Sequence, residues 1–382
     1  MTRTVLVTGA SGLVGSAAVD AFLDAGWEVV AVSRRPPEVF SDRPFKHLRV
    51  DLQDPVACSQ AFTGLPGVSH VVYAAVHEKP GLIAGWRDPE QMATNLAMIR
   101  NVIEPLARVA SLRHVTLLQG TKAYGAHLHP IRIPAREREP RDDHPNSYWF
   151  QEDYIREASA RCGFAWTIFR PTIVLGPNVG VAMNTIPVIG VYAALCRAEG
   201  KAFSYPGHVA YPREAVDTRL IGGAAVWAAD NPHAWGEHFN LTNGEVFSWR
   251  DLWPSLAEYL DVQLGPDQPL CLAQYLPSRA ELWSRIVHEQ GLQPLSMAQL
   301  LGESHHSADA RFGYGLKTAP APTFVSTIKI KQAGFTQVYD TEACVKHWLG
   351  VLMDRRILPR TTRPPRTSPA PCLQTGSPDP ER

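Results

Sequence analysis

The segment VLVTGASGLVGSAAVDAFLDAGWEVVAVSRRP, residues 5–36, constrains the fold of this chain more than any other stretch. An apolar run from Val5 to Val7 leads directly into glycines at positions 9, 12 and 15. A helical pattern of apolar residues then continues to Gly26, and a second apolar run, WEVVAV, follows it. A strand, a glycine turn, a helix and a strand in this order predict a βαβ unit that binds a dinucleotide.

Each glycine of the turn has its own expected role. Gly9 permits the tight turn, Gly12 lets the backbone approach a pyrophosphate, and Gly15 lets the helix pack against the strand. The start of the helix adds free N–H donors and the positive end of its dipole. A glycine-rich turn without a ligand is the alternative, and the strand–turn–helix–strand context disfavours it.

The residues after the second strand indicate which cofactor is bound. Folds of this kind that prefer NAD usually carry Asp or Glu there, which accepts a hydrogen bond from the ribose 2′-hydroxyl. This chain has Ser33, Arg34 and Arg35 instead. Two guanidinium groups can bind a 2′-phosphate, and no carboxylate repels it. The pair therefore predicts NADPH, against the alternative of a solvated basic turn.

Alternating strands and helices continue beyond this unit and predict the fold class. Further strands are expected in HLRVDLQD (47–54), HVVYAA (70–75), HVTLLQG (114–120) and AWTIFRP (165–171), with a long helix over 90–110. The pattern predicts an α/β protein with a Rossmann-type, doubly wound parallel sheet that binds ligands at the carboxyl ends of its strands.

Domain boundaries follow from changes in this pattern. We expect an NADP-binding core over residues 1–175 and a smaller, mostly helical substrate lobe over 176–360, with some return of the chain to the core. Residues 361–382 are rich in Pro, Ser and Arg and have few groups to bury, so we expect a disordered tail there.

Composition excludes several classes of partner. The net charge is zero, which gives no electrostatic reason to expect binding to nucleic acid or to an anionic membrane. The longest apolar run, residues 186–196, is too short to cross a bilayer. The six cysteines are scattered, which favours a reduced compartment over a disulfide scaffold or a zinc site. With a first strand that begins almost at once, we expect a cytoplasmic protein without a bound metal.

The segment NSYWFQEDYI (146–155) places Tyr148 at the head of a predicted helix. In many short-chain dehydrogenases such a tyrosine is followed four residues later by a lysine, but here Glu152 stands in that place. None of the eleven tyrosines has a lysine at the fourth following position. Lys122, in LLQGTKAYG, leaves the fifth strand at its carboxyl end and is the candidate for a displaced lysine.

Two chemical arguments link Lys122 and Tyr148. A phenol near an ammonium group is favoured in its ionised form. A phenol over a carbonyl oxygen can also stabilise negative charge that grows there. From position alone, a solvated lysine and a tyrosine that only packs are as consistent with the sequence as two catalytic residues.

The chain resembles the progesterone 5β-reductase/iridoid synthase-like enone reductases, an atypical branch of the extended short-chain dehydrogenases, over roughly residues 3–359. The resemblance rests on the arginine pair in the segment 33–36 (SRRP), on the segment 120–124 (GTKAY) and on the segment 146–153 (NSYWFQED). Longer segments, VYAALCRAEGKAFSYPG, FNLTNGEVFSWRDLW and WSRIVHEQGL, look like the family too. The resemblance implies NADPH-dependent reduction of the C=C bond of α,β-unsaturated carbonyl compounds, with Lys122 and Tyr148 as catalytic residues.

By the same matching, a set of residues along the ends of the strands is expected to contact NADPH. With Gly9 and Gly15 of the turn, these are Ser11, Gly12, Leu13, Arg34, Arg35, Asp51, Leu52, Ala75, Leu118, Tyr148, Val174, Val181, Ala182 and Met183.

Four positions that border the family's substrate pocket differ in this chain. Ser147, Trp149, Ala123 and Val76 stand where the family has Phe, Tyr, His and Trp. The loss of that Trp predicts a wider pocket, and the identity of the small-molecule enone stays open.

Two other functions remain as alternatives. One is an extended short-chain dehydrogenase acting on C=O or on a nucleotide sugar. The other is an NADP-sensing protein without turnover. Assembly as a homodimer is also left open.

Overall fold

The computed structural model describes residues 3–79 and 84–361 of the chain. The tail predicted from residue 361 therefore lies, apart from its first residue, outside the described residues. No helix within these two ranges is long and apolar enough to cross a membrane.

A seven-stranded sheet forms the centre of the larger lobe, with the order β3-β2-β1-β4-β5-β6-β9 and every neighbouring pair parallel. The order reverses beside β1, which is the switch point where ligands bind in doubly wound sheets. The predicted fold class is confirmed. The strands are β1 (Thr4–Thr8), β2 (Glu28–Val32), β3 (Lys46–Leu48), β4 (Val68–Tyr73), β5 (His114–Leu118), β6 (Ala165–Pro171) and β9 (Glu237–Leu241).

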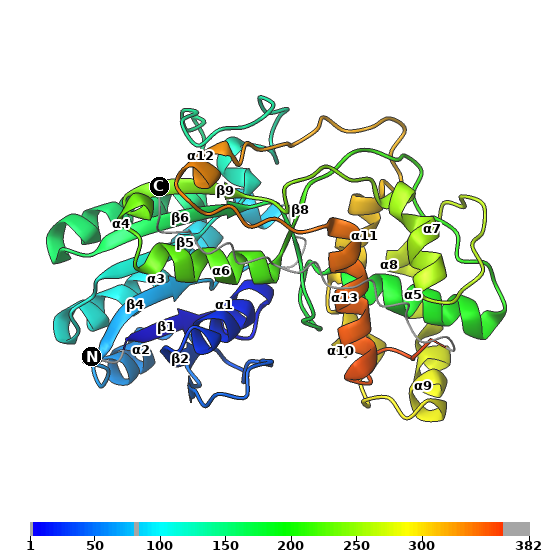
Figure 1. The fold of residues 1–382 in the computed structure, drawn as a ribbon, viewed down its shortest axis with the longest axis horizontal. Helices are drawn as coiled ribbons and strands as arrows, with labels where there is room; N and C mark the ends of the chain where they lie inside the picture. The colour runs from blue at the N-terminus through cyan, green and yellow to red at the C-terminus, as the bar shows by residue number, and fades with distance from the viewer. Residues whose placement is uncertain (1–2, 80–83, 362–382) are drawn as a thin grey trace, which may run out of the picture.

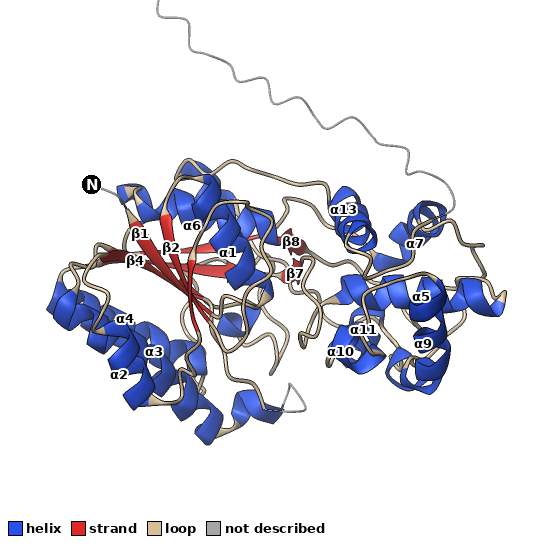
Figure 2. Ribbon diagram, turned by 90° about the horizontal axis from the view of Figure 1, so that it is seen from below, coloured by secondary structure: helices blue, strands red, loops and turns tan. Residues whose placement is uncertain are grey.

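Helices cover both faces of this sheet, as Figure 2 shows. On one face lie α2 (Pro55–Phe62), α3 (Pro89–Val109) and α4 (Ser147–Cys162), and their side chains share one apolar core with the sheet. On the other face lie α1 (Leu13–Asp24) and α6 (Thr218–Ala229). Each large aliphatic or aromatic side chain that is fully buried here contributes roughly 1.5–3 kcal/mol.

The strand predicted over 47–54 ends early, at Leu48. The side chain of Asp54 accepts hydrogen bonds from the N–H groups of Val56 and Ala57 and caps α2. The amide of Asp54 in turn donates to the carbonyl of Asp51. The chain is therefore already turning at Asp51 and Leu52, which lie beyond the end of β3.

The larger lobe is completed by segments from the second half of the chain. Helix α6 packs closely on α1, because a side chain at Gly222 would come within 2.7 Å of the Ala17 carbonyl oxygen. Strand β9 adds the last strand beside β6, and α12 (Ile328–Gln332) packs near it with Ile330 buried.

The smaller lobe is helical and lies beside the carboxyl ends of the strands (Figure 1). A short parallel pair, β7 (Ile173–Leu175) and β8 (Ala215–Asp217), lies between the lobes. The helices are α5 (Thr185–Glu199), α7 (Trp249–Tyr259), α8 (Leu272–Tyr275), α9 (Ala280–Glu289), α10 (Met297–Leu301), α11 (Ser304–Phe312) and α13 (Thr341–Asp354), with the 3-10 turn η4 (Pro277–Arg279). An aromatic core holds them together, with the rings of Phe203 and Trp253 stacked at 4.5 Å. The 3-10 turn η3 (Pro232–Ala234) belongs to the larger lobe, where Ala234 packs with α6 and β9.

Candidate active site

The glycine turn has the geometry that a pyrophosphate requires. Gly9 has a φ of 64°, and a side chain there would come within 2.6 Å of the Ala74 carbonyl oxygen. A side chain at Gly15 would overlap the Gly9 carbonyl. Gly12 is the N-cap of α1 and supplies no side chain to cap the first amides, which leaves these N–H groups available to an anion. The turn therefore fits a dinucleotide phosphate.

The other predicted cofactor residues also line this edge of the sheet. Arg34 and Arg35 follow β2, are exposed, and pair with no carboxylate of the described residues. Ala75 follows β4, Leu118 ends β5 and Val174 lies in β7. Ser11 and Leu13 lie at the start of α1. These residues therefore lie at or just beyond the carboxyl ends of the strands, with Asp51 and Leu52 in the turn after β3.

The loop 176–184 spans from α1 to the smaller lobe and carries Val181, Ala182 and Met183. Asn178 donates to the Ser16 hydroxyl at 3.0 Å, which fixes the loop to α1. Asn184 donates to the carbonyls of Gly176 and Asn178 and closes the loop on itself. From the other lobe, Ser304 donates to the Val181 carbonyl at 2.6 Å. Both lobes therefore position this part of the predicted cofactor site.

Lys122 and Tyr148 meet around the indole of Trp86. Lys122 lies in the 3-10 turn η2 (Thr121–Tyr124), directly after β5, and Tyr148 is the second residue of α4. The Lys122 ammonium lies 3.8 Å from the centre of the Trp86 ring. The rings of Trp86 and Tyr148 are 4.9 Å apart. A cation–π contact and an edge-to-face ring contact therefore bring the two predicted catalytic residues to one indole.

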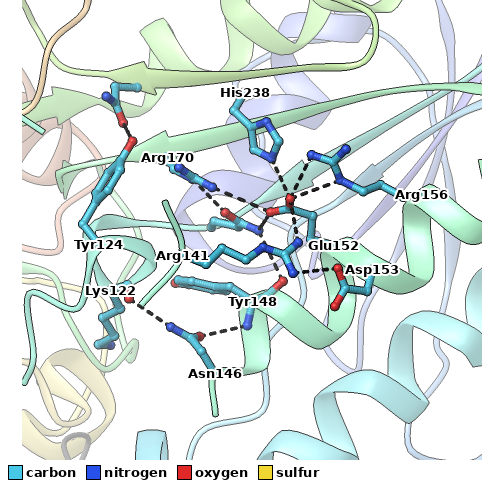
Figure 3. Close-up of polar contacts among 12 residues, drawn as sticks. Lys122, Tyr124, Arg141, Asn146, Tyr148, Glu152, Asp153, Arg156, Arg170 and His238 are labelled. Carbon is cyan, nitrogen blue, oxygen red and sulfur yellow. Dashed lines mark hydrogen bonds and ion pairs between the residues drawn. The ribbon is translucent and has the colours of Figure 1, made fainter. Parts of the chain in front are cut away.

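Asn146 fixes the relative placement of the two residues. Its side chain is buried, and its amide donates to the Lys122 carbonyl at 2.9 Å (Figure 3). Its oxygen accepts from the Tyr148 amide at 3.0 Å, which caps α4. Gly120 leaves room beside them, because a side chain there would lie 3.3 Å from the Tyr148 hydroxyl.

Burial dominates the electrostatics of the pair. It lowers the pKa of Lys122 to about 8, with Glu78 opposing the shift and Arg311 adding to it. Burial raises the pKa of Tyr148, Glu78 raises it further and Arg170 opposes the rise. The effect of a nearby ammonium group, which favours the ionised phenol, is therefore outweighed by burial, which disfavours the phenolate. Tyr148 is a protonated hydrogen-bond donor at neutral pH.

Glu152, in the place of the ordinary lysine, is the centre of a buried ion cluster (Figure 3). It is 2% exposed and accepts from Arg141 at 2.8 Å and from Arg156 at 3.0 Å. The His238 Nε2 atom lies 3.0 Å from the same carboxylate oxygen. Burial alone would raise the pKa of Glu152, but His238 and Arg141 outweigh it and hold the pKa well below its usual range.

Gln119 connects this cluster to Tyr148. Its amide donates to Glu152 at 3.2 Å and to the Tyr148 carbonyl at 3.4 Å. Its oxygen accepts from Arg170 of β6 at 2.9 Å. Glu152 is therefore a positioning residue, which fixes the first turns of α4 against the sheet.

Trp86 and Asn146 were missed by the sequence analysis. Trp86 lies in the 3-10 turn η1 (Ala84–Arg87), is 3% exposed, and donates to Glu78 at 3.1 Å. Val76, which stands where the family has Trp, is 54% exposed. The wider pocket stays a prediction, although Trp86 brings an indole to Lys122 and Tyr148 from elsewhere in the chain. The N-cap preference of Asn before a helix was the available signal for Asn146.

A parallel dinucleotide-binding sheet, with a lysine and a protonated tyrosine together at its carboxyl edge, defines an oxidoreductase of the short-chain dehydrogenase/reductase superfamily. The chain belongs to the NAD dependent epimerase/dehydratase family, whose sequence profile matches residues 5–242.

Similar proteins narrow the assignment of this chain to one branch of the superfamily. An (S)-8-oxocitronellyl enol synthase of Catharanthus roseus is 29% identical over 317 residues, which are 77% of this chain and 79% of the relative. A second one, from Camptotheca acuminata, is 30% identical over 308 residues, 75% of this chain and 77% of the relative. The resemblance to the iridoid synthase-like enzymes is confirmed.

Solved structures share the fold at lower identity. UDP-glucose 4-epimerase of Thermotoga maritima, solved with UDP-glucose, has a TM-score of 0.65 at 17% identity and covers 92% of this chain and 99% of its own. The enzyme WbmG of Bordetella bronchiseptica, solved with NAD, has a TM-score of 0.61 at 15% identity, covering 94% and 96%.

The Glu152 cluster generates a stability prediction. Replacing Glu152 with Gln removes the carboxylate that lies 3.7 Å from the buried Arg170 and also pairs with the more exposed Arg141 and Arg156, so we expect a loss of roughly 3–5 kcal/mol in the free energy of unfolding. The matched control is Asp153→Asn, whose 59% exposed side chain pairs, among the described residues, only with Arg141 and should cost about 0–1 kcal/mol. Urea unfolding measures both. Equal midpoints for the two variants would show that the buried cluster is not a stabilising anchor.

Proposed function

We propose that this chain catalyses the NADPH-dependent reduction of the C=C bond of α,β-unsaturated carbonyl compounds. The observation that carries the proposal is the meeting of Lys122 and Tyr148 around Trp86, although they come from different elements. The enol synthases among the relatives support it, because an enol forms when a hydride adds to the β-carbon of a conjugated carbonyl compound and a proton adds to its oxygen.

NADPH is the proposed cofactor because of Arg34 and Arg35. Both are exposed at the end of β2, and no described carboxylate occupies either guanidinium. Arg35 lies against the loop 176–184, since its Nη1 atom is 3.9 Å from the position a side chain at Gly180 would take. A 2′-phosphate bound at this place would replace the water that solvates the guanidinium groups of Arg34 and Arg35.

In the proposed mechanism, the β-carbon of the substrate accepts the hydride that bound NADPH supplies. Negative charge then develops on the carbonyl oxygen. The Tyr148 hydroxyl, protonated because burial raises its pKa, donates a hydrogen bond to that oxygen. Lys122 places a positive charge beside the same region, and Trp86 holds its ammonium in position. Asn146 holds Lys122 and Tyr148 in fixed positions relative to each other.

Product analysis tests the reaction itself. We expect the full chain to oxidise NADPH with simple enones and to release the saturated ketone, because the hydrogen bond from Tyr148 stabilises charge on oxygen while the β-carbon is reduced. An allylic alcohol would instead support reduction of C=O. Tight NADPH binding without any turnover across enones of graded size would support a sensing role.

The phenol role is tested by Tyr148→Phe. Loss of the donor should lower kcat by about 10²–10⁴-fold while the dissociation constant of NADPH changes little. Tyr124→Phe is the matched control, because the Tyr124 hydroxyl donates to Asn240 at 2.7 Å within a buried network. Stopped-flow reduction and NADPH fluorescence titration measure the two quantities. A Tyr148→Phe enzyme as fast as the Tyr124→Phe control contradicts the proposed role.

Cofactor choice is tested by replacing Arg34 and Arg35 together with Ala. Each lost charge-assisted hydrogen bond is worth about 1.5–3 kcal/mol, so the preference for NADPH over NADH should fall by roughly tenfold or more. Arg43→Ala removes another exposed arginine of the same lobe and should leave the preference unchanged. The ratio of kcat/KM for the two cofactors gives the answer, and an unaltered ratio in the double variant rules out this selection.

A further inference from the structure

Two arginines of the smaller lobe pair with no carboxylate of the described residues, and the charge of one of them, Arg311, acts on Lys122. Arg213 lies just before β8, and Arg311 lies in α11. Neither forms an ion pair with any residue in the ranges 3–79 and 84–361. Cations held inside a protein are ordinarily paired, so two unpaired guanidinium groups side by side call for an explanation.

Arg311 is fixed at one edge and free at the other. Its Nη1 atom donates to the Met183 carbonyl at 3.1 Å and to the Thr185 hydroxyl at 2.6 Å. Its Nε and Nη2 atoms form no hydrogen bond with the described residues. Arg311 therefore contacts the end of the predicted cofactor loop and still has donors for a further group.

Arg213 is held beside it by Tyr211. Its Nη2 atom donates to the Tyr211 hydroxyl, and its guanidinium lies 4.1 Å from the centre of that ring. The Tyr211 hydroxyl donates to the Ala310 carbonyl at 2.7 Å, which ties this pair to α11 directly before Arg311. The Nε atom of Arg213 is buried and has no hydrogen-bond partner. One donor of this guanidinium is thus already desolvated and unused.

The charge of Arg311 acts on both Arg213 and Lys122. Burial lowers the pKa of Arg311 to about 10, and the charge of Arg213 lowers it further against Tyr211. After burial and Glu78, the charge of Arg311 also lowers the pKa of Lys122. Arg311 remains charged at neutral pH, so a second positive charge acts on the proposed reaction centre.

We propose that Arg213 and Arg311 form an anion subsite for the substrate, so that the preferred substrates are enones bearing an oxyanion such as a carboxylate. The inference rests on the proposed enone reduction and names its substrate class. An oxyanion would accept from the unused donors of both guanidinium groups and compensate their mutual repulsion. Its contact with Arg311 would also link the substrate to Met183, and through it to the cofactor loop.

The experiment compares 6-oxohept-4-enoate with its methyl ester, using the full chain and NADPH. The two compounds share the enone and differ in charge, so the ratio of their kcat/KM values measures the anion subsite. We expect the wild type to prefer the acid by roughly tenfold or more, the size of one charge-assisted hydrogen bond. Arg213→Gln should bring this ratio close to one, and Arg213→Lys should restore part of it.

Arg250→Gln is the matched control, since it removes one positive charge from an exposed arginine of the same lobe that pairs with Asp267. This control should keep the wild-type ratio. No preference for the acid in the wild type, or equal loss in both Gln variants, overturns the subsite. An Arg213→Gln enzyme that binds NADPH more weakly but keeps the acid-to-ester ratio of kcat/KM also overturns the subsite, because the arginines would then bind the cofactor and not the substrate.

Failure of the proposed function is distinguished by a binding measurement. If neither compound oxidises NADPH, the proposed reduction is wrong, and calorimetry on the NADP⁺-loaded protein then tests the subsite alone. Binding of 6-oxoheptanoate that exceeds that of its methyl ester and is lost in Arg213→Gln supports the anion subsite. Equal binding of acid and ester overturns it.

Discussion

The buried carboxylate of Glu152 is the interaction on which the geometry of the site depends. It gathers Arg141, Arg156 and His238 around α4, and through Gln119 it reaches β6. Removing this carboxylate leaves the buried guanidinium of Arg170, 3.7 Å away, without its counter-charge, and an uncompensated buried charge costs several kcal/mol. The helix that presents Tyr148 is therefore held in one position relative to the sheet. A lysine at this place, as in ordinary short-chain dehydrogenases, would meet guanidinium groups, so the ammonium has to come from another element.

The second constraint is that both lobes hold the loop 176–184, which belongs to the proposed cofactor site. The loop is bound to α1 through Asn178 and to α11 through Ser304 and Arg311. A ligand that contacts this loop would interact with both lobes at once, and its binding energy would add to the stability of their arrangement. The proposed anion subsite belongs to the same connection, because Arg311 holds the loop with one edge of its guanidinium and has unused donors on the other.

The sequence predicted the parallel sheet, the glycine turn and the placement of Lys122 at a strand end, because each is encoded by neighbouring residues with a regular spacing. Trp86 was not predicted, because its contacts with Lys122 and Tyr148 join residues far apart in the chain and follow no period. The raised pKa of Tyr148 was not predicted, for a related reason. Proximity to an ammonium group can be guessed from order along the chain, but burial, which dominates this pKa, is a property of the packed structure.

The link through Asn146 has a consequence for how such enzymes diversify. The Asn146 side chain is hydrogen-bonded to the Lys122 carbonyl and to the Tyr148 amide at the start of α4. The intervening residues 125–145 take no part in these two hydrogen bonds. When lysine and tyrosine share one helix, their separation is set by the pitch of that helix and is the same in every descendant. Here the two are joined by residues 125–145, which are themselves held at the buried Ala135 and, through its ion pair with Glu152, at Arg141. Insertions and deletions between these fixed points can change the rim of the site without moving Lys122 and Tyr148.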